Sequence, residues 1–499
     1  MTPVRLRFAP SPTGYLHIGS VWTALFGWMY ARRCQGQFIL RIEDTDTKRT
    51  VEGATDYLME GLRWFGIDWD EGPDIGGPYG PYTQTERAPL YQHWAHWLVE
   101  QGHAYKCFAT EEELKQIRAD LEAKGDHSGY DRRYRDMPPQ EADALAAAGK
   151  PYAIRLKMPL SGQTIMPDLL RGDVVFENQQ FTDYVLLKSS GLPTYHLAHV
   201  IDDHFMRITH VTRGIEWLST APIHIQLWRA FGWEMPIYVH LPVILSPSGK
   251  GKLSKRDHAF LESGERIYVR ADEFREAGYL PAALVNFLAT IGWSFGNDVE
   301  KFTLDEALAR FDLKDLSPSP TKLPYSKLDW LNGQYIQEMS PRALAQAVLP
   351  FLQEAGYEGE AEDLLGVMPA MSVRLKKLSE AVDFLRFLFE KEPLTLTVRD
   401  LTHKQMGPAA SLQAFREARD FLAAAEPFDL PTIDAGLRRI GERATSNGKA
   451  GPFLGTARLA ITRQQVSPPL FESILALGRP RTLRRLDEVI ALLAHSASA

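Results

Sequence analysis

The first 43 residues restrict the possible folds more than any other part of the sequence. Residues 4–9 predict a β-strand, residues 20–33 a helix and residues 37–43 a second strand, and the turn APSPTG follows the first strand. The helix has one apolar face, formed by Val21, Leu25, Trp28 and Met29. Strand, helix and strand in this order predict the parallel sheet of a nucleotide-binding α/β domain.

The turn at residues 12–20, PTGYLHIGS, leads into a helix N-terminus, where free backbone N–H groups and the helix dipole attract phosphate. Gly14 and Gly19 allow a ligand to approach the backbone closely, and His17 offers a further hydrogen-bond donor. Taken singly, the turn is also compatible with a glycine-rich surface loop that carries a histidine.

A second segment, SGKGKLSKRDH at residues 248–258, is rich in glycine and lysine and lacks the residue order of a Walker P-loop. The ammonium groups of Lys252 and Lys255 can close over a triphosphate and neutralise the departing pyrophosphate. A solvated basic loop is the alternative interpretation of this segment alone.

The two segments together resemble the paired signatures of class I aminoacyl-tRNA synthetases, here His17-Ile18-Gly19-Ser20 and Lys252-Leu253-Ser254-Lys255-Arg256. The small residue Ser20 stands where the generic signature has histidine, as is common in the glutamyl branch. Further segments resemble bacterial glutamyl-tRNA synthetases in family order: RFAPSPTG from Arg7, RIEDTD from Arg41, GPYTQTER from Gly80, YHLAHVIDDH from Tyr195, TRGIEWLSTAPIH from Thr212 and KLDWLNGQYI from Lys327.

This resemblance implies a multidomain α/β plus all-α protein. We expect a Rossmann-like catalytic domain at residues 1–85 and 191–245, interrupted by an acceptor-binding insertion at 86–190. The KLSKR loop and a stem-contact region follow at 246–323, and a helical anticodon-binding domain at 324–499. From about residue 184 to 197 we expect the chain to return to a strand-like, apolar pattern.

Glutamate needs a cation for its side-chain carboxylate and an acidic or polar group for its ammonium group, because buried charges must be paired. The resemblance implies the following roles. Glutamate is bound by Arg7, Ser11, Glu43, Tyr195 and Arg213. ATP is bound by Gly14, His17, Gly19, Ser20, Glu216, Trp217, Lys252, Ser254 and Lys255, of which His17, Lys252 and Lys255 are catalytic. Mg²⁺ is expected to arrive with ATP.

His199 departs from the resemblance, since the family frequently has asparagine at this position. His199, Asp202, Asp203 and His204 also suggest a metal site, but hydrogen-bonded structural roles are favoured for side chains at this spacing. Cys107 has no neighbouring cysteine, so we expect no structural zinc.

The formal net charge of −7 argues against indiscriminate nucleic-acid binding, but residues 438–485 carry ten basic residues against Glu442 and Glu472. Phosphate contacts to tRNA(Glu) are expected there, from Arg438, Arg439, Arg443, Arg484 and Arg485. Exposed helix faces with no partner are the alternative. With only two cysteines and no apolar run long enough to cross a bilayer, we expect a cytoplasmic protein, monomeric by default.

Three alternatives remain at the level of the sequence. The protein can also charge glutamine tRNA, it can be a nucleotidyltransferase that shares the same fold without tRNA, or it can be an RNA-binding relative without catalysis. The long helical C-terminal region argues against the second, and the two phosphate-handling segments argue against the third.

Overall fold

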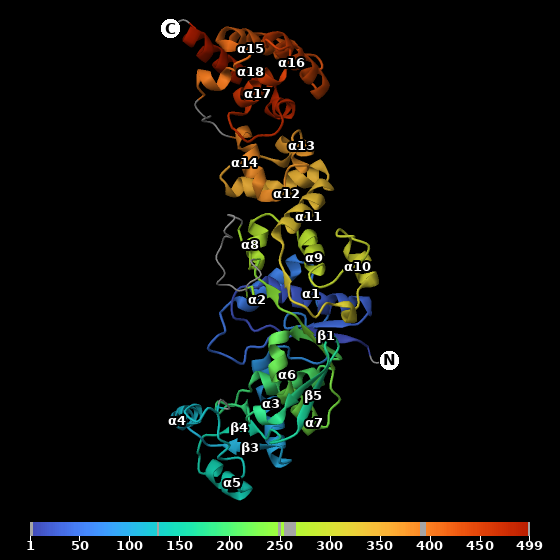
Figure 1. Cartoon of the computed structure of the whole chain (residues 1–499), viewed down its shortest axis with the longest axis vertical. Helices are drawn as coiled ribbons and strands as arrows, with labels where there is room; N and C mark the ends of the chain where they lie inside the picture. Colours follow the sequence, from blue (N-terminus) through green and yellow to red (C-terminus); the bar gives the residue numbers. More distant parts are fainter. Residues whose placement is uncertain (1–2, 127–128, 248–250, 254–265, 390–395, 498–499) are drawn as a thin grey trace. The chain divides into compact units, whose positions relative to one another are not determined.

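A computed structural model of the chain describes residues 3–126, 129–247, 251–253, 266–389 and 396–497. The chain divides into two units (Figure 1). The first consists of Met1–Glu273 and Leu284–Tyr325, and the second of Phe274–Ala283 and Ser326–Ala499. No helix among the described residues is both long and apolar enough to cross a membrane.

The first unit begins with the expected strand, helix and strand. Strands β1 (Arg5–Phe8) and β2 (Gln37–Leu40) pair in parallel, and α1 (Ile18–Arg33) connects them. Helix α1 starts two residues earlier than predicted, because His17 caps its N-terminus. Strand β2 stops at Leu40, so residues 41–43 form a connection at the carboxyl end of the strand.

A four-stranded sheet lies beside this pair, in the order β6 (Gly172–Glu177), β5 (Gln163–Asp168), β9 (Ile237–Leu241) and β8 (His210–Gly214). Strands β8 and β9 are parallel, and β5 and β6 form an antiparallel hairpin. The backbone N–H of Thr209 donates to the carbonyl of Arg5 at 2.9 Å, which brings β1 next to β8. The carboxyl ends of β1, β2 and β8 therefore meet at one edge, where α/β proteins bind their ligands.

Two helices of the first unit, α6 (Tyr195–Phe205) and α7 (Ala221–Phe231), share one apolar cluster and pack against each other. The expected strand-like pattern from residue 184 to 197 is correct only for β7 (Val185–Leu187) and wrong for residues 195–197, which begin α6. A turn at Gly191, with φ of +82°, separates the two elements. The buried face of α6 explains why its start has an apolar sequence.

The segment between β2 and α6 also contains an antiparallel sheet of β3 (Ala104–Cys107), β4 (Ala153–Leu156) and β7. Its helices are α2 (Ala54–Trp64), α3 (Ala88–Glu100), α4 (Glu111–Glu122) and α5 (Pro139–Ala147). After β9 come β10 (Ile244–Leu245), α8 (Ala271–Glu276), α9 (Pro281–Ala289), α10 (Leu304–Arg310) and β11 (Thr321–Lys322).

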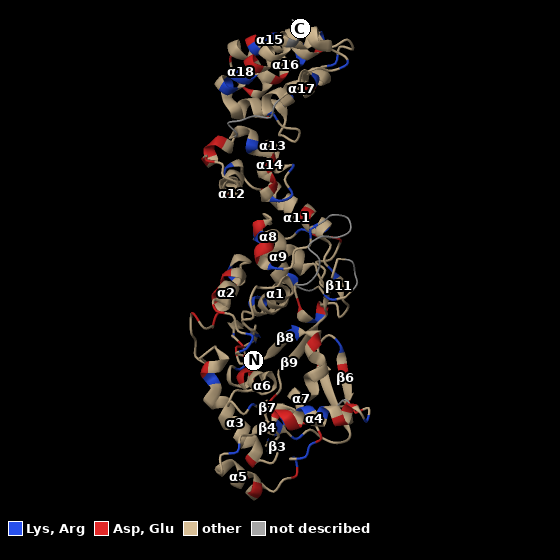
Figure 2. Ribbon diagram, turned by 90° about the vertical axis from the view of Figure 1, so that its left-hand side faces the viewer, with Lys and Arg blue, Asp and Glu red and all other residues tan. Residues whose placement is uncertain are grey.

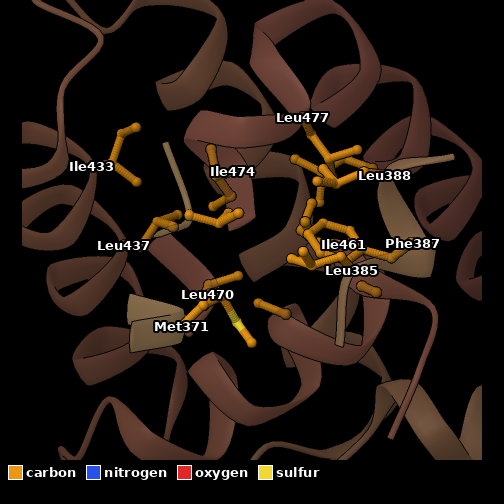
Figure 3. Packing of buried hydrophobic residues seen from close by; sticks show 14 of the residues in the cluster. Met371, Leu385, Phe387, Leu388, Ile433, Leu437, Ile461, Leu470, Ile474 and Leu477 are labelled. Carbon is orange, nitrogen blue, oxygen red and sulfur yellow. The ribbon is translucent and has the colours of Figure 1, made fainter. Parts of the chain in front are cut away.

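From residue 326 onward the described chain contains helices and no strand, so the predicted all-helical C-terminal region is confirmed. Its helices are α11 (Tyr325–Gln337), α12 (Pro341–Glu354), α13 (Met368–Ser372), α14 (Ala381–Leu385), α15 (Gly407–Ala424), α16 (Leu430–Ala444), α17 (Gly451–Thr462) and α18 (Leu470–Ala497). Leu470, Ile474 and Leu477 on one face of α18 join residues of other helices in a single apolar core (Figure 3). Burial of this face stabilises a helix far more than intrinsic propensity does.

Candidate active site

A cavity of about 1220 Å³ lies in the first unit, at the carboxyl ends of β1, β2 and β8. Every described residue that the sequence assigned to glutamate or ATP lines it: Arg7, Ser11, Gly14, His17, Gly19, Ser20, Glu43, Tyr195, Arg213, Glu216, Trp217 and Lys252. Ser254 and Lys255, which we also assigned to ATP, lie outside the described residues. One cavity thus collects side chains from segments more than 200 residues apart.

The turn before α1 holds His17 in a fixed orientation. Its Nδ1 accepts a hydrogen bond of 2.9 Å from the backbone N–H of Gly19 and so caps the helix. Since Nδ1 is the acceptor, the neutral ring carries its proton on Nε2. Gly14 has φ of +118°, a conformation that residues with a side chain rarely adopt. A histidine that caps a helix through Nδ1 and carries its proton on Nε2 suits contact with a phosphate.

Arg7 and Glu43 belong to a buried network of ion pairs. The Nε of Arg7 donates to Asp203 at 3.0 Å, and Arg41 donates to Asp203 at 2.7 Å and to Glu43 at 3.0 Å. Burial opposes the ionisation of Asp203, but Arg7 and Arg41 outweigh it and hold the pKa of Asp203 well below its usual value. Burial raises the pKa of Glu43, and the two arginines offset this only in part. No role could be expected for Arg41 from the sequence alone.

Asp202 anchors the same network from its other side. Its carboxylate accepts hydrogen bonds from Arg87 at 2.7 Å, from Gln84 at 2.9 Å and from Tyr91 at 2.8 Å. The ring of His204 stacks on Trp233, with ring centroids 3.8 Å apart. Among the residues that the structure describes, no group of three His, Cys, Asp or Glu side chains is placed to hold a metal ion.

Cys107 lies in the β3–β4–β7 part of the first unit. It is buried, and its Sγ lies 3.2 Å from the hydroxyl of Tyr130. The guanidinium of Arg155 lies over the Tyr130 ring at 3.8 Å. Hydrogen bonding and packing therefore account for this buried thiol.

Arg213 is buried, with 4% of its surface exposed, and its hydrogen-bond partners are mainly neutral rings. Its Nε donates to Nε2 of His240 at 3.0 Å, its Nη2 to Nδ1 of His224 at 3.3 Å, and its Nη1 to the hydroxyl of Tyr195 at 3.4 Å. No carboxylate of a described residue forms an ion pair with it. This contrasts with Arg7, whose charge Asp203 compensates.

His199 is fully buried and stacks on Tyr195, with ring centroids 5.1 Å apart. Its Nε2 lies 3.2 Å from the hydroxyl of Tyr238 and 3.5 Å from Nη1 of Arg213. Burial lowers the pKa of His199 well below the usual value, and Asp203 offsets this only in part. His199 therefore contributes a neutral ring to the wall behind Tyr195.

At the mouth of the cavity, Lys252 donates to Glu216 at 2.8 Å. About half of each side chain is exposed. Burial favours the neutral acid at Glu216, but the hydrogen bond from Lys252 outweighs it and lowers the pKa of Glu216. Trp217 packs on Tyr195 with ring centroids 4.0 Å apart. This aromatic pair forms one wall of the cavity.

The arginines predicted to contact tRNA have different surroundings within the second unit. Arg439 and Arg484 are exposed, Arg438 pairs with Asp434, and Arg443 pairs with Glu417 at 2.7 Å. Figure 2 shows acidic and basic residues interspersed on α15, α16 and α18.

Arg485 differs from these four arginines, because it is buried within the helical core. It donates to the carbonyls of Phe387 at 2.7 Å and of Ile461. Burial, followed by the nearby charge of Arg463, lowers the pKa of Arg485 to about 10. Its hydrogen bonds thus link three parts of the helical core.

Comparison with known proteins agrees with this geometry. Residues 3–330 match the family described as tRNA synthetases class I (E and Q), catalytic domain, and residues 343–490 match an anticodon binding domain. The glutamate–tRNA ligase of Roseiflexus castenholzii is 46% identical over 99% of this chain and 97% of its own length. That of Chloroflexus aurantiacus is also 46% identical, over 99% of each chain.

Solved structures give the same result. The crystal structure of a glutamate tRNA ligase from Elizabethkingia meningosepticum in complex with its amino acid superposes with a TM-score of 0.87, at 35% identity, over 98% of this chain and 99% of that one. The fold and the site therefore define a class I tRNA synthetase. Within that class, the chain belongs to the glutamate–tRNA ligase family.

Proposed function

We propose that the protein ligates L-glutamate to the 3′ end of tRNA(Glu) with consumption of ATP. The observation that carries this proposal is one cavity lined both by the turn at His17 and by two buried arginines, Arg7 and Arg213. The full-length similarity to glutamate–tRNA ligases supports the same activity.

In the first step, an oxygen of the glutamate α-carboxylate attacks the α-phosphorus of ATP. A new O–P bond forms, the bond to the β-phosphate oxygen breaks, and pyrophosphate leaves with its electron pair. No protein nucleophile is needed, because the carboxylate is already ionised at neutral pH. In our proposal His17, Lys252 and Lys255 stabilise the developing phosphate charge, and Mg²⁺ is carried on the triphosphate.

In the second step, the terminal ribose 2′-hydroxyl oxygen of tRNA attacks the activated carbonyl carbon and forms an ester bond. The bond from that carbon to the phosphate oxygen breaks, AMP leaves with the electron pair, and the hydroxyl proton is released. Glu43 is assigned to the substrate ammonium group, Arg7 and Arg213 to its side-chain carboxylate, and Ser11 and Tyr195 to the adjoining wall. Gly14, Gly19, Ser20, Glu216, Trp217 and Ser254 are assigned to ATP. We further propose that the enzyme acts as a monomer in the cytoplasm, where charged tRNA is consumed.

Charging assays with purified glutamate and glutamine tRNAs test the proposal. We expect glutamate to be joined to tRNA(Glu), with one AMP and one pyrophosphate released for each molecule charged. Glutamate on the glutamine tRNA as well would reveal a less restricted ligase. Nucleotide transfer that ignores tRNA, or tRNA binding with no ATP consumption, would refute the proposal.

A further inference from the structure

Arg7 and Arg213 have different partners in the cavity. Those of Arg213 include histidines that have no role in the proposed reaction. Arg7 forms an ion pair with Asp203, whereas Arg213 donates hydrogen bonds to the rings of His224 and His240. Both histidines are fully buried. A buried guanidinium whose direct partners are neutral is stabilised by an anion in contact with it, and a carboxylate of the ligand can supply that anion.

His240 is positioned by the register of the sheet. Strands β8 and β9 are parallel, and Arg213 is the direct partner of His240 in that register. The Nδ1 of His240 lies 2.7 Å from Oδ2 of Asp168, which also accepts the backbone N–H of His240 at 2.9 Å. Because the carboxylate can only accept, the imidazole proton lies on Nδ1, and Nε2 is left to accept from Arg213.

His224 comes from α7 and completes a second chain of hydrogen bonds. Its Nδ1 accepts from Nη2 of Arg213 at 3.3 Å, so the neutral ring carries its proton on Nε2. The Nε2 of His224 lies 3.0 Å from Nδ1 of His196 and donates a hydrogen bond to it. Burial, followed by the proximity of His199 and Arg213, lowers the pKa of His224 and keeps its ring neutral. The hydrogen bonds from Arg213 to His224 and from His224 to His196 are therefore all donated in one direction, away from the guanidinium.

We propose that His224 and His240 are positioning residues that fix the guanidinium of Arg213 through neutral acceptors and so make the receptor selective for the carboxylate of glutamate over the amide of glutamine. This inference rests on the proposed function. A carboxylate ligand places an anion in direct contact with Arg213, whereas an amide leaves the guanidinium with neutral groups alone in contact and the carboxylate of Asp168 behind His240. Replacing either histidine with aspartate would place an anion beside Arg213 and weaken the preference for glutamate over glutamine.

The test compares substitutions that keep or remove the acceptor. The amide oxygen of asparagine occupies nearly the position of imidazole Nδ1, and that of glutamine nearly the position of Nε2. At His224 we compare His224→Asn with His224→Gln, and at His240 we compare His240→Gln with His240→Leu. Aminoacylation of tRNA(Glu) by the full-length enzyme is measured while glutamate and ATP are varied separately, and thermal unfolding is recorded for each variant.

We expect His224→Asn and His240→Gln to keep the KM for glutamate within a few-fold of the parent. His224→Gln and His240→Leu are expected to raise it about tenfold to a hundredfold, with the KM for ATP nearly unchanged. His224→Asp is expected to reduce the ratio of kcat/KM for glutamate to that for glutamine by at least about tenfold.

Equal losses in the acceptor-keeping and acceptor-removing variants would overturn the inference, as would equal rises of the KM for glutamate and ATP. An unchanged preference for glutamate in a folded His224→Asp variant would also overturn it. Should His240→Leu fail to fold, the His224 pair decides, because both of its members are polar and neutral. Failure of the proposed function is distinct, because the parent enzyme would then not charge tRNA with glutamate at all.

Discussion

The Nδ1 atom of His17 accepts a hydrogen bond of 2.9 Å from the backbone N–H of Gly19, so the same imidazole caps α1 and faces the cavity. These two roles can be separated, because asparagine is among the best N-cap residues but lacks the imidazole Nε2–H. We expect His17→Asn to retain the stability of the parent while the rate of glutamate activation falls by about 10²-fold.

His17→Ala is the comparison for that experiment, since it removes both the cap and the donor. It should lose a similar factor in rate and also about 1 kcal/mol in the free energy of unfolding. Pyrophosphate exchange in the presence of tRNA reports the rate, and urea unfolding reports stability. Wild-type exchange by His17→Asn would show that the imidazole serves the helix alone.

Much of this site follows from local sequence patterns. The order of strand, turn and helix, the helical character of the C-terminal region and the cavity-lining positions of His17 and Lys252 all come from short segments. A hydrophobic period or a turn signal depends on neighbours in the chain, so it can be recognised without knowing the tertiary contacts, although residues 195–197 show that it can also mislead.

The partners of the buried charges could not be predicted in this way. The pairing of Arg213 with His240 depends on the register between two strands, and the pairing of Arg7 with Asp203 joins residues 196 positions apart. The sequence favours a hydrogen-bonded role for Asp203 over a metal site, but its partners Arg7 and Arg41 could not be named because they are distant in the sequence. Arg484 and Arg485 differ even as neighbours, since successive residues of a helix point about 100° apart.

Lys252 forms an exposed ion pair with Glu216 at the mouth of the cavity. Solvent screens such a pair, so its loss should change the free energy of unfolding by less than about 1 kcal/mol. In contrast, Lys252→Met should lower the rate of glutamate activation by about 10²-fold, because a cation that stabilises the phosphates is removed.

Lys314→Met is the matched control for that prediction, since Lys314 is also exposed and pairs with Asp312 in the same unit. Both substitutions remove one charge and one ion pair, but only Lys252 lines the cavity. Pyrophosphate exchange measured for the two variants side by side distinguishes them. A loss of the same size in Lys314→Met would point to an effect of net charge rather than to a role in catalysis.

The buried histidines predict a particular loss of stability in acid. Burial, followed by the charge of Arg213, lowers the pKa of His196 to about 4, from about 6.5 in the unfolded chain. The folded state thus favours the neutral ring, and its contribution is complete above about pH 6.5 and is lost as the pH falls towards 4. One such histidine steepens the fall by up to about 1.4 kcal/mol per pH unit.

His196→Asn should therefore flatten the dependence of unfolding free energy on pH between 6.5 and 4, while its amide oxygen still accepts from His224. Urea unfolding at a series of pH values measures the slope. His103→Asn, at an exposed histidine, removes a titrating group outside the cluster and serves as the control. Identical slopes for the two variants and the parent would contradict the prediction.

The arginines of the helical domain should divide into two groups. Arg439 and Arg484 are exposed. If they bind phosphates, a protein that lacks them releases fewer counterions from tRNA when the complex forms. The double substitution Arg439→Ala and Arg484→Ala should weaken tRNA binding and reduce the slope of log K against log salt by about 0.7 to 0.9 for each phosphate that is no longer neutralised. The stability of the folded domain should hardly change.

Arg485→Ala should instead lower the stability of the protein, because Arg485 is buried and donates to the carbonyls of Phe387 and Ile461. Leaving two buried acceptors without a donor costs about 1 to 3 kcal/mol each, so the free energy of unfolding should fall by several kcal/mol. Filter binding over a salt series and thermal unfolding separate the two groups, with Arg416→Ala on α15 as an exposed control. If the double variant kept the parental salt slope, the exposed arginines would be ordinary solvated side chains.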